Sequence, residues 1–227
     1  MSLLREKLAA SPIHARVVPY VLILLLTFTQ DGLFKAEGRY WMYLVKMLVG
    51  LWCILEMRSL VPELRWAVSW EAVAVGILVF VIWVGLDPWY AKISFLVSNG
   101  PPWNPLEQFG KSAEGWFFVV VRTFGSAIIV PPIEESFYRS FLYRYFVRQK
   151  FTELPLNRLH WLSLVVTSAV FGFVHYQWLA GILCGLCFQW LVIRKNRLGD
   201  AMTAHAITNF LLGVYIPWQG GSAWHFW

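Results

Sequence analysis

Four polar side chains of types that suit hydrolysis lie within apolar stretches of this 227-residue sequence. They are Glu134, His175, His205 and Asn209. Carboxylate and imidazole side chains can exchange protons with water, and an amide side chain can donate hydrogen bonds. Ionisable side chains are costly inside a bilayer, so a membrane protein that keeps them there is generally using them. The residue types therefore predict a water-activating catalytic site.

The spacing of these residues predicts how they face one another. Positions four apart share one side of a helix, so Glu135 is expected to pair with Arg139, and His205 and Asn209 are expected to point into one cavity. Glu134 lies about 100° around the helix from Glu135. We therefore expect different tasks for the two carboxylates, with one facing the cavity while Arg139 holds the other.

Two prolines, Pro131 and Pro132, come directly before the carboxylates. They remove two backbone donors and are expected to open the helix about one turn upstream. Irregular backbone at membrane depth is tolerated where it lines a cavity. The prolines therefore predict that a cavity lies beside the two glutamates.

The amino-acid composition indicates an integral membrane protein. Hydrophobic residues make up 58% of the chain and charged residues only 14%, and there are 14 Trp and 17 Phe. Aromatic side chains are enriched at membrane–water interfaces, and the apolar runs are continuous rather than alternating as in a transmembrane barrel. We expect an all-α, polytopic integral membrane protein of about seven to eight transmembrane helices with an intramembrane catalytic cavity. The net charge of +6 is spread over short loops, which argues against nucleic-acid binding.

Seven stretches are apolar enough to span a bilayer with help from neighbours and interfaces. They are 16–33, 40–57, 67–86, 115–133, 159–175, 178–194 and 200–217. The residues after the fourth stretch, 134–150, are expected to continue as an interfacial helix.

Residues 1–227 are expected to form one membrane domain with three parts. The first, 1–86, has three spans without evident chemistry, and 87–114 is a loop rich in Pro, Gly and Asn. The last part, 115–217, carries all the candidate catalytic residues and is the predicted catalytic core.

The distribution of Lys and Arg predicts the topology. These residues concentrate in the second, fourth and sixth loops, whereas the loop 87–114 and the tail after Ile216 have few or none. Because basic loops stay in the cytoplasm, the amino terminus is predicted to be cytoplasmic and the carboxyl terminus outside. The first apolar run lacks a small-x-small cleavage site and is expected to remain as an uncleaved anchor.

Three short motifs occur in order on separate predicted helices: E-E-S-F-Y-R at 134–139, F-G-F-V-H at 171–175 and H-A-I-T-N at 205–209. They resemble the signatures of the CAAX-protease and bacteriocin-processing family, also called the Abi family, of intramembrane glutamate-dependent endopeptidases. The resemblance covers about 105–217. One departure is Ser140, where family members often have Gly after the Arg of the first motif.

The resemblance implies an endopeptidase that works without a metal or another cofactor. It assigns Glu134 as the general base that takes a proton from water, with His175 helping to hold that water. His205 and Asn209 would donate hydrogen bonds to the oxyanion of the tetrahedral intermediate. The implied reaction is hydrolysis of a peptide bond near the terminus of a membrane-associated substrate, in CAAX-type or related processing.

The resemblance also assigns Glu135 and Arg139 as supporting partners of the catalytic residues. It implies a protein or peptide substrate at the lipid bilayer, which in the family can be lipidated. The overall pattern is similar to that of bacterial members, which implies an integral, multi-pass protein of the bacterial inner (plasma) membrane.

Two alternatives remain open on the sequence. One is a zinc-dependent membrane peptidase that uses Glu134, His175 and His205 as ligands. Against it, Asn209 has no place as a ligand and the chain has no H-E-x-x-H helix. The other is a catalytically silent membrane protein, such as an immunity or scaffold protein or a transporter fragment. In that case the four polar residues need not converge, and a transporter should show inverted repeats, which the sequence lacks.

Overall fold

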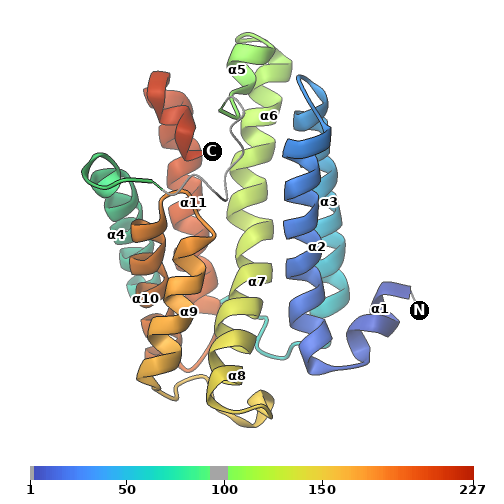
Figure 1. The fold of residues 1–227 in the computed structure, drawn as a ribbon, viewed down its shortest axis with the longest axis vertical. Helices are drawn as coiled ribbons and strands as arrows, with labels where there is room; N and C mark the ends of the chain where they lie inside the picture. The colour runs from blue at the N-terminus through green and yellow to red at the C-terminus, as the bar shows by residue number, and fades with distance from the viewer. Residues whose placement is uncertain (1–2, 93–101) are drawn as a thin grey trace.

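The computed structural model describes residues 3–92 and 102–227, and every regular element within these ranges is helical (Figure 1). The long helices are α2 (Pro12–Leu33), α3 (Gly38–Met57), α4 (Trp70–Leu86), α10 (Trp178–Lys195), α11 (Gly199–Gln219) and a continuous helix over Ala113–Val147. The shorter elements are α1 (Leu3–Ala9), η1 (Asp87–Trp89), α5 (Pro105–Gln108), η4 (Phe151–Glu153), α9 (Trp161–Phe173) and η5 (Gly221–Phe226).

Five of the described helices are long and apolar enough to cross a membrane. Their outer faces carry exposed apolar side chains, among them Leu25, Leu48, Leu78 and Val120. A soluble protein does not leave so much apolar surface in water, whereas lipid tails cover it. The predicted all-α membrane fold is therefore confirmed. α9 has 13 residues and α11 is less apolar because it carries polar residues on its buried face, yet both pack in the same bundle.

The end of α9 differs from the sequence expectation. The stretch 159–175 was expected to be one helix, but α9 begins at Trp161 and ends at Phe173. His160 caps its start, with the ring Nδ1 accepting from the backbone N–H of Ser163 at 3.2 Å. His175 therefore lies in the turn between α9 and α10 rather than on a helix.

The helix over Ala113–Val147 lies in the middle of the bundle (Figure 1). It consists of α6 (Ala113–Phe124), the π-helix η2 (Gly125–Ile129), α7 (Val130–Glu135), the π-helix η3 (Ser136–Leu142) and α8 (Tyr143–Val147). α2 and α3 pack on one side of it, and α11 packs on the other. The residues after Glu134 are thus the second half of this long central helix, and they continue it to Val147.

The prolines open the central helix as the sequence predicts. The π-helix η2 ends at Ile129, two residues before Pro131, and the N–H of Val130 donates to the carbonyl of Gly125, five residues back. In the same register, the residue after Val130 would donate to the carbonyl of Ser126. Pro131 has no N–H, so the Ser126 carbonyl is left to accept from another group.

Small residues bring α9 and α10 into close contact. A Cβ added at Gly181 would lie 2.8 Å from the Cα of Gly172, and one added at Gly185 would lie 2.9 Å from the Cα of Ser168. Glycine is required where two helix backbones approach this closely. The two helices therefore form a tightly packed hairpin.

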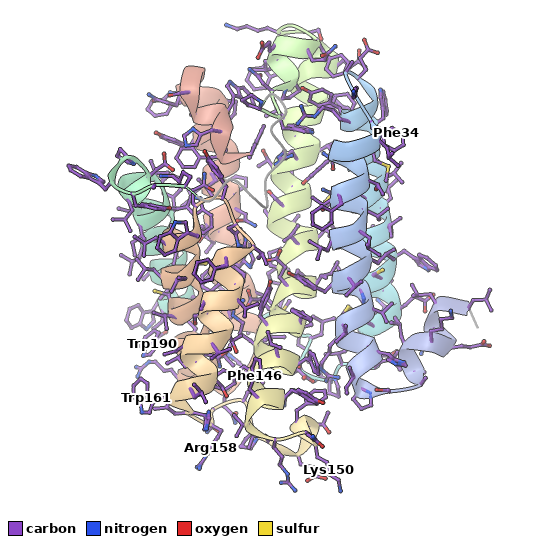
Figure 2. All side chains as sticks on the ribbon, viewed as in Figure 1. Phe34, Phe146, Lys150, Arg158, Trp161 and Trp190 are labelled. Atoms are coloured by element: carbon purple, nitrogen blue, oxygen red, sulfur yellow. The ribbon has the colours of Figure 1, made fainter. Side chains whose placement is uncertain are left out.

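The ends of the bundle differ in charge. Figure 2 shows Lys150 and Arg158 at one end, with Trp161 and Trp190 nearby, and Phe34 near the other end. The loop before α4 lies at the Lys150 end as well, because its Glu63 pairs with Arg144 at 2.6 Å. The loop before α11 lies there too, because Asn196 Oδ1 accepts from the backbone N–H of Asn157 at 3.1 Å. The basic loops predicted to lie on one side of the membrane are thus together.

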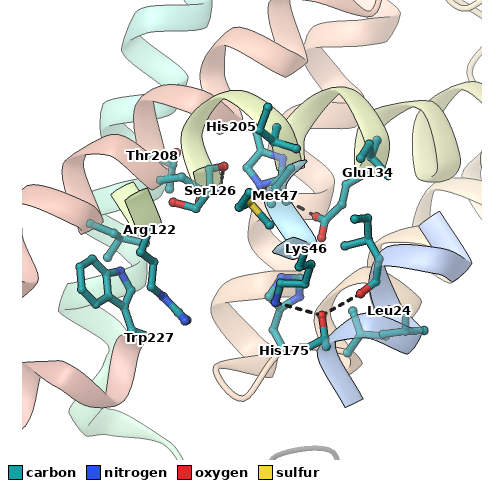
Figure 3. A pocket seen from close by; sticks show the side chains of 18 of the residues that line it. Leu24, Lys46, Met47, Arg122, Ser126, Glu134, His175, His205, Thr208 and Trp227 are labelled. Atoms are coloured by element: carbon teal, nitrogen blue, oxygen red, sulfur yellow. Dashed lines mark hydrogen bonds and ion pairs between the residues drawn. The ribbon is translucent and has the colours of Figure 1, made fainter. Parts of the chain in front are cut away.

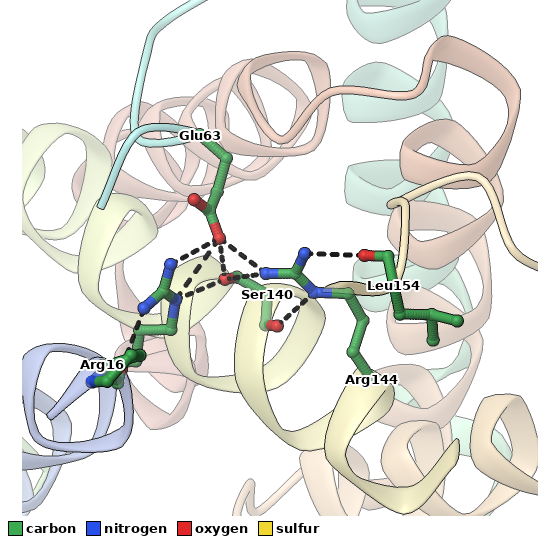
Figure 4. Close-up of polar contacts among 6 residues, drawn as sticks. Arg16, Glu63, Ser140, Arg144 and Leu154 are labelled. Atoms are coloured by element: carbon green, nitrogen blue, oxygen red, sulfur yellow. Dashed lines mark hydrogen bonds and ion pairs between the residues drawn. The ribbon is translucent and has the colours of Figure 1, made fainter. Parts of the chain in front are cut away.

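A buried ionic network at this end fastens α2 to the central helix (Figure 4). Glu63, in the loop after α3, pairs with Arg16 of α2 at 2.8 Å and with Arg144 of α8 at 2.6 Å. The Ser140 hydroxyl accepts from Arg16 Nε at 2.7 Å and donates to the Glu63 carboxylate. Burial acts to raise the pKa of Glu63, but Arg16, Ser140 and Arg144 together hold it below its usual range.

Candidate active site

The central helix borders a cavity of about 350 Å³, which all four predicted catalytic residues line (Figure 3). Glu134 comes from the central helix, His175 from the turn between α9 and α10, and His205 and Asn209 from α11. Side chains more than seventy residues apart in the sequence therefore meet around one space. A catalytically silent protein would not require this convergence.

The two adjacent carboxylates face different surroundings. The Glu134 side chain lines the cavity and keeps 21% of its surface exposed, whereas Glu135 is fully buried. Oε2 of Glu135 lies 3.2 Å from Arg139 Nε, and Oε1 lies 2.9 Å from His205 Nδ1. The structure thus separates the carboxylates as the helix geometry predicts, with Glu134 toward the cavity and Glu135 held by Arg139.

Arg139 is 1% exposed and is surrounded by aromatic rings as well as by Glu135. Its guanidinium carbon lies 4.4 Å from the ring centre of Phe171 and 5.5 Å from that of Phe188. Aromatic faces attract a desolvated cation. These contacts fix the guanidinium, and through it the carboxylate of Glu135.

His205 connects the two carboxylates. Because an ionised carboxylate only accepts hydrogen bonds, the Nδ1–H of His205 donates to Glu135, and Nε2 is the nitrogen that faces Glu134. Nε2 lies 3.9 Å from Oε2 of Glu134, which is longer than a direct hydrogen bond. Glu135 thus fixes the tautomer and orientation of a ring that faces Glu134.

His175 is oriented in a similar way. Its Nδ1–H donates to the backbone carbonyl of Phe171 at 2.7 Å, because a carbonyl only accepts. Its ring also contacts the rings of Phe171 and Trp83, with centroids 4.7 Å and 5.5 Å away. In the neutral ring, Nε2 is then the nitrogen that can accept a hydrogen bond.

Asn209 binds the carbonyl that the prolines leave unused. Its Nδ2 donates to the backbone oxygen of Ser126 at 2.9 Å, which uses one of its two amide hydrogens. The second N–H remains for another acceptor. Ser126 was not predicted from the sequence, although Pro131, five residues on, was the signal that could have located it.

Two cationic side chains also line the cavity, Lys46 of α3 and Arg122 of α6. The sequence motifs assigned no role to either of them. A charged residue within an apolar helix is a signal of function, but it does not say which cavity the side chain reaches. Both residues lie away from the three motifs in the sequence.

The zinc alternative requires at least three suitable side chains close together. Within the described ranges, 3–92 and 102–227, no group of three His, Cys, Asp or Glu side chains is arranged to hold a metal ion. The Nδ1–H groups of His205 and His175 donate to protein acceptors, which is also how metal-ligating histidines are held, so only the spacing of the side chains bears on this alternative. The geometry therefore gives no support to a ligand set of Glu134, His175 and His205.

Comparison with known proteins agrees with the motifs. Residues 115–211 match the model of a family described as type II CAAX prenyl endopeptidase Rce1-like. The matched region runs from α6 into α11 and contains all six residues singled out from the sequence. No curated protein and no solved structure matches the chain.

Proposed function

We propose that this protein is an intramembrane endopeptidase that uses Glu134 to activate water. The match of residues 115–211 to the Rce1-like family of type II CAAX prenyl endopeptidases supports the proposal. The observation that carries the proposal is the meeting of Glu134, His175, His205 and Asn209 at one cavity. The substrate is a protein or peptide held at the membrane.

The first step of the proposed reaction belongs to Glu134. Its carboxylate takes a proton from a water molecule, and the water oxygen attacks the carbonyl carbon of the scissile peptide bond. Nε2 of His175 accepts a hydrogen bond from the same water and orients it. When the tetrahedral intermediate collapses, the proton held by Glu134 passes to the leaving amine nitrogen, which restores the carboxylate.

The negative charge that develops on the carbonyl oxygen needs donors. Asn209 supplies its second amide N–H, because the first is used by Ser126. With its Nδ1–H directed to Glu135, His205 can donate from Nε2 only when both ring nitrogens carry a proton. Donors aimed in advance at developing charge are each worth a factor of about 10²–10³ in kcat.

The substrate can reach this cavity from the bilayer side. Leu24 of α2 and Val174 of the turn after α9 both line the cavity, and they keep 36% and 40% of their surfaces exposed. The cavity therefore has an apolar rim where lipid would lie. Such a rim suits a membrane-anchored substrate, and a lipid modification is one way of providing that anchor.

Glu134→Gln is the direct test. The variant keeps the shape of the side chain but cannot act as a base, so cleavage of membrane peptides should fall by at least about 10²-fold. The melting temperature of the purified protein should stay near that of the wild type, because Glu134 is not part of the buried ion pair.

Glu153→Gln is a suitable control, because Glu153 is exposed, pairs with the exposed Arg148 at 2.8 Å and does not line the cavity. It should leave both activity and melting unchanged. A Glu134→Gln protein that still cleaves at the wild-type rate would reject the assignment of Glu134 as base. Full activity in the presence of a chelator would argue against the zinc alternative.

A further inference from the structure

A second cavity, of about 310 Å³, lies at the basic end of the bundle. Three loops form it: the loop between α3 and α4, the loop before α9 and the loop between α10 and α11. It shares no described lining residue with the catalytic cavity, and none of its residues belongs to the three sequence motifs. It is therefore a separate feature of the molecule.

The cavity lies at the height where neighbouring spans begin and end. The span Trp70–Trp89 begins just after the first of these loops, and the span Trp178–Lys195 ends directly before Asn196, which lines the cavity. Val68 and Trp70 beside it are 73% and 75% exposed, as apolar side chains are where a protein meets lipid. Lipid headgroups occupy this layer of the membrane.

Two guanidinium groups line the cavity, those of Arg65 and Arg197. The Arg65 side chain is exposed, and no ion pair or hydrogen bond joins it to another residue within the described ranges. Arg197 is half exposed and donates to Asp200 from Nε at 2.5 Å and from Nη2 at 3.3 Å, which leaves Nη1 for another acceptor. Guanidinium groups bind phosphate oxygens through parallel hydrogen bonds.

Asn196 supplies an uncharged donor between them. Its backbone has a left-handed conformation with a φ of 51°, and its Oδ1 accepts from the backbone N–H of Asn157 at 3.1 Å. Because the amide oxygen is engaged, the Nδ2 group is the part of this side chain that can bind an acceptor in the cavity.

The carboxylates beside the cavity are already neutralised. Glu63 also lines it, but its Oε1 contacts both Arg16 and Arg144 (Figure 4). Asp200 is fully buried and is paired with Arg197. The cations around the cavity therefore outnumber the carboxylates, and a group bound here would meet a net positive charge.

The rest of the lining is apolar. It includes Pro62, Leu156 and the ring of Trp66, which is 48% exposed and lies two residues before the lipid-facing Val68. A small inorganic anion needs only the donors. A phospholipid places a phosphate directly beside an apolar glycerol ester and its acyl chains, so both kinds of wall would be used.

We propose that this cavity binds the phosphate group of an anionic phospholipid, with Arg65, Arg197 and Asn196 as the donors and Trp66 against the apolar part. Basic pockets between spans at the headgroup layer are suited to such lipids. The inference does not depend on the proposed peptidase reaction. A bound lipid would join the loop before α4 to the loop before α11.

The experiment measures ligand binding by the full chain, purified in detergent and freed of native lipid. Dioleoylphosphatidylglycerol, dioleoylphosphatidylcholine and inorganic phosphate are each added at about 0.15 M salt. Lipid binding is followed by native mass spectrometry, and all three ligands are compared by the melting temperature. Phosphatidylcholine has the same chains and phosphate but no net charge, whereas inorganic phosphate has the charge without the chains.

We expect phosphatidylglycerol to bind about tenfold more tightly than phosphatidylcholine and to raise the melting temperature more than inorganic phosphate does. Arg65→Gln should weaken phosphatidylglycerol about fivefold, and Arg65→Lys should retain part of the affinity. Asn196→Asp keeps the oxygen that accepts from Asn157 but replaces the donor by a negative charge, so it should weaken binding at least as much. Arg148→Gln removes the same charge at the same end, outside the cavity, and should leave the affinity unchanged.

Three results would overturn the site. The first is equal binding of the two lipids by the wild-type protein. The second is a preference for phosphatidylglycerol that survives unchanged in both Arg65→Gln and Asn196→Asp. The third is an equal rise in melting temperature with inorganic phosphate alone, which would identify a soluble anion as the ligand. The comparison of lipids uses the wild-type protein, so it holds even if a variant folds poorly.

Discussion

At the scale of single residues, the site depends on the division of work between two neighbouring carboxylates. Glu135 is buried between Arg139 and His205, whereas Glu134 faces the cavity. The buried carboxylate of Glu135 neutralises the charge of Arg139 and orients the ring of His205. We propose that Glu134, which keeps part of its surface exposed to the cavity, exchanges a proton with water.

Glu135→Gln should therefore behave unlike Glu134→Gln. Removing one partner of a buried ion pair leaves the other charge uncompensated and costs about 3–5 kcal/mol. We expect Glu135→Gln to lower both the melting temperature and the activity, because Arg139 loses its counter-ion and His205 its orienting acceptor. Thermal unfolding and cleavage measured on the same preparation test this, and a Glu135→Gln protein that melts like the wild type would contradict it.

Asn209→Ala should affect the chemistry rather than substrate binding. The substitution removes one proposed oxyanion donor, so kcat should fall about 10²–10³-fold with little change in KM. Ser126→Ala is the matched control, because Asn209 binds the backbone carbonyl of Ser126 and not its side chain. Steady-state kinetics on both variants would show a large loss for one and nearly none for the other. Equal kcat values would remove Asn209 from the mechanism.

At the scale of elements, the central helix owes its shape to two prolines. The π-helical turn before Pro131 and the missing N–H at that position leave the Ser126 carbonyl for Asn209 on α11. A local defect in one helix thereby sets the position of a side chain on another.

Pro131→Ala tests this link. It restores an N–H that can donate to the Ser126 carbonyl and compete with Asn209, so kcat should fall while the melting temperature is unchanged or rises. In Pro132→Ala the restored N–H would face Ala127 in the same register, so the loss of activity should be smaller. A Pro131→Ala enzyme with the wild-type kcat would show that the two features are independent.

The same elements show which parts of the fold and the site could be predicted from the sequence. The spans follow from continuous apolar stretches, and the pairing of Glu135 with Arg139 follows from a spacing of four residues; both are local signals. The aromatic surroundings of Arg122 have no such signal, because Tyr43, Trp103 and Trp227 come from three distant segments. The exact end of α9 also depends on its contact with α10, so the position of His175 in a turn was missed.

At the scale of the whole molecule, α2 and the loop after α3, which lie outside the matched region, are joined to it by an ionic network. Glu63 bridges Arg16 of α2 and Arg144 of α8, and Ser140, the departure from the family pattern, binds all three. The hydroxyl that replaces glycine is thus used in the connection between the two parts.

This network predicts a dependence of stability on pH. The folded protein holds the pKa of Glu63 below its usual range, so the contribution of this group to stability is complete above the unfolded-state value of about 4.3. It is lost as the pH falls through the lower folded-state pKa. Melting curves in detergent from pH 7 to pH 3 should fall more steeply for the wild type than for Glu63→Gln, which should already be less stable at pH 7. Parallel curves would contradict the prediction.

The orientation in the membrane remains a prediction from the basic loops, which lie at one end of the bundle. We expect Arg148→Cys, at that end, to react with a membrane-impermeant maleimide only after permeabilisation. Trp218→Cys, near the end of α11, should react in intact cells. Both positions are exposed, and both variants are made after replacing the native Cys53, Cys184 and Cys187 by Ala. The reverse labelling pattern would show that the amino terminus lies outside.

The glycine contacts between α9 and α10 have a consequence for how hydrolysis could be controlled. Because these helices touch backbone to backbone, we expect the turn that carries His175 to move together with them rather than with the central helix that carries Glu134. A small tilt of the hairpin against the central helix would part the imidazole from the carboxylate without unwinding either helix. A sideways shift of the α9–α10 hairpin alone would then stop the proposed hydrolysis.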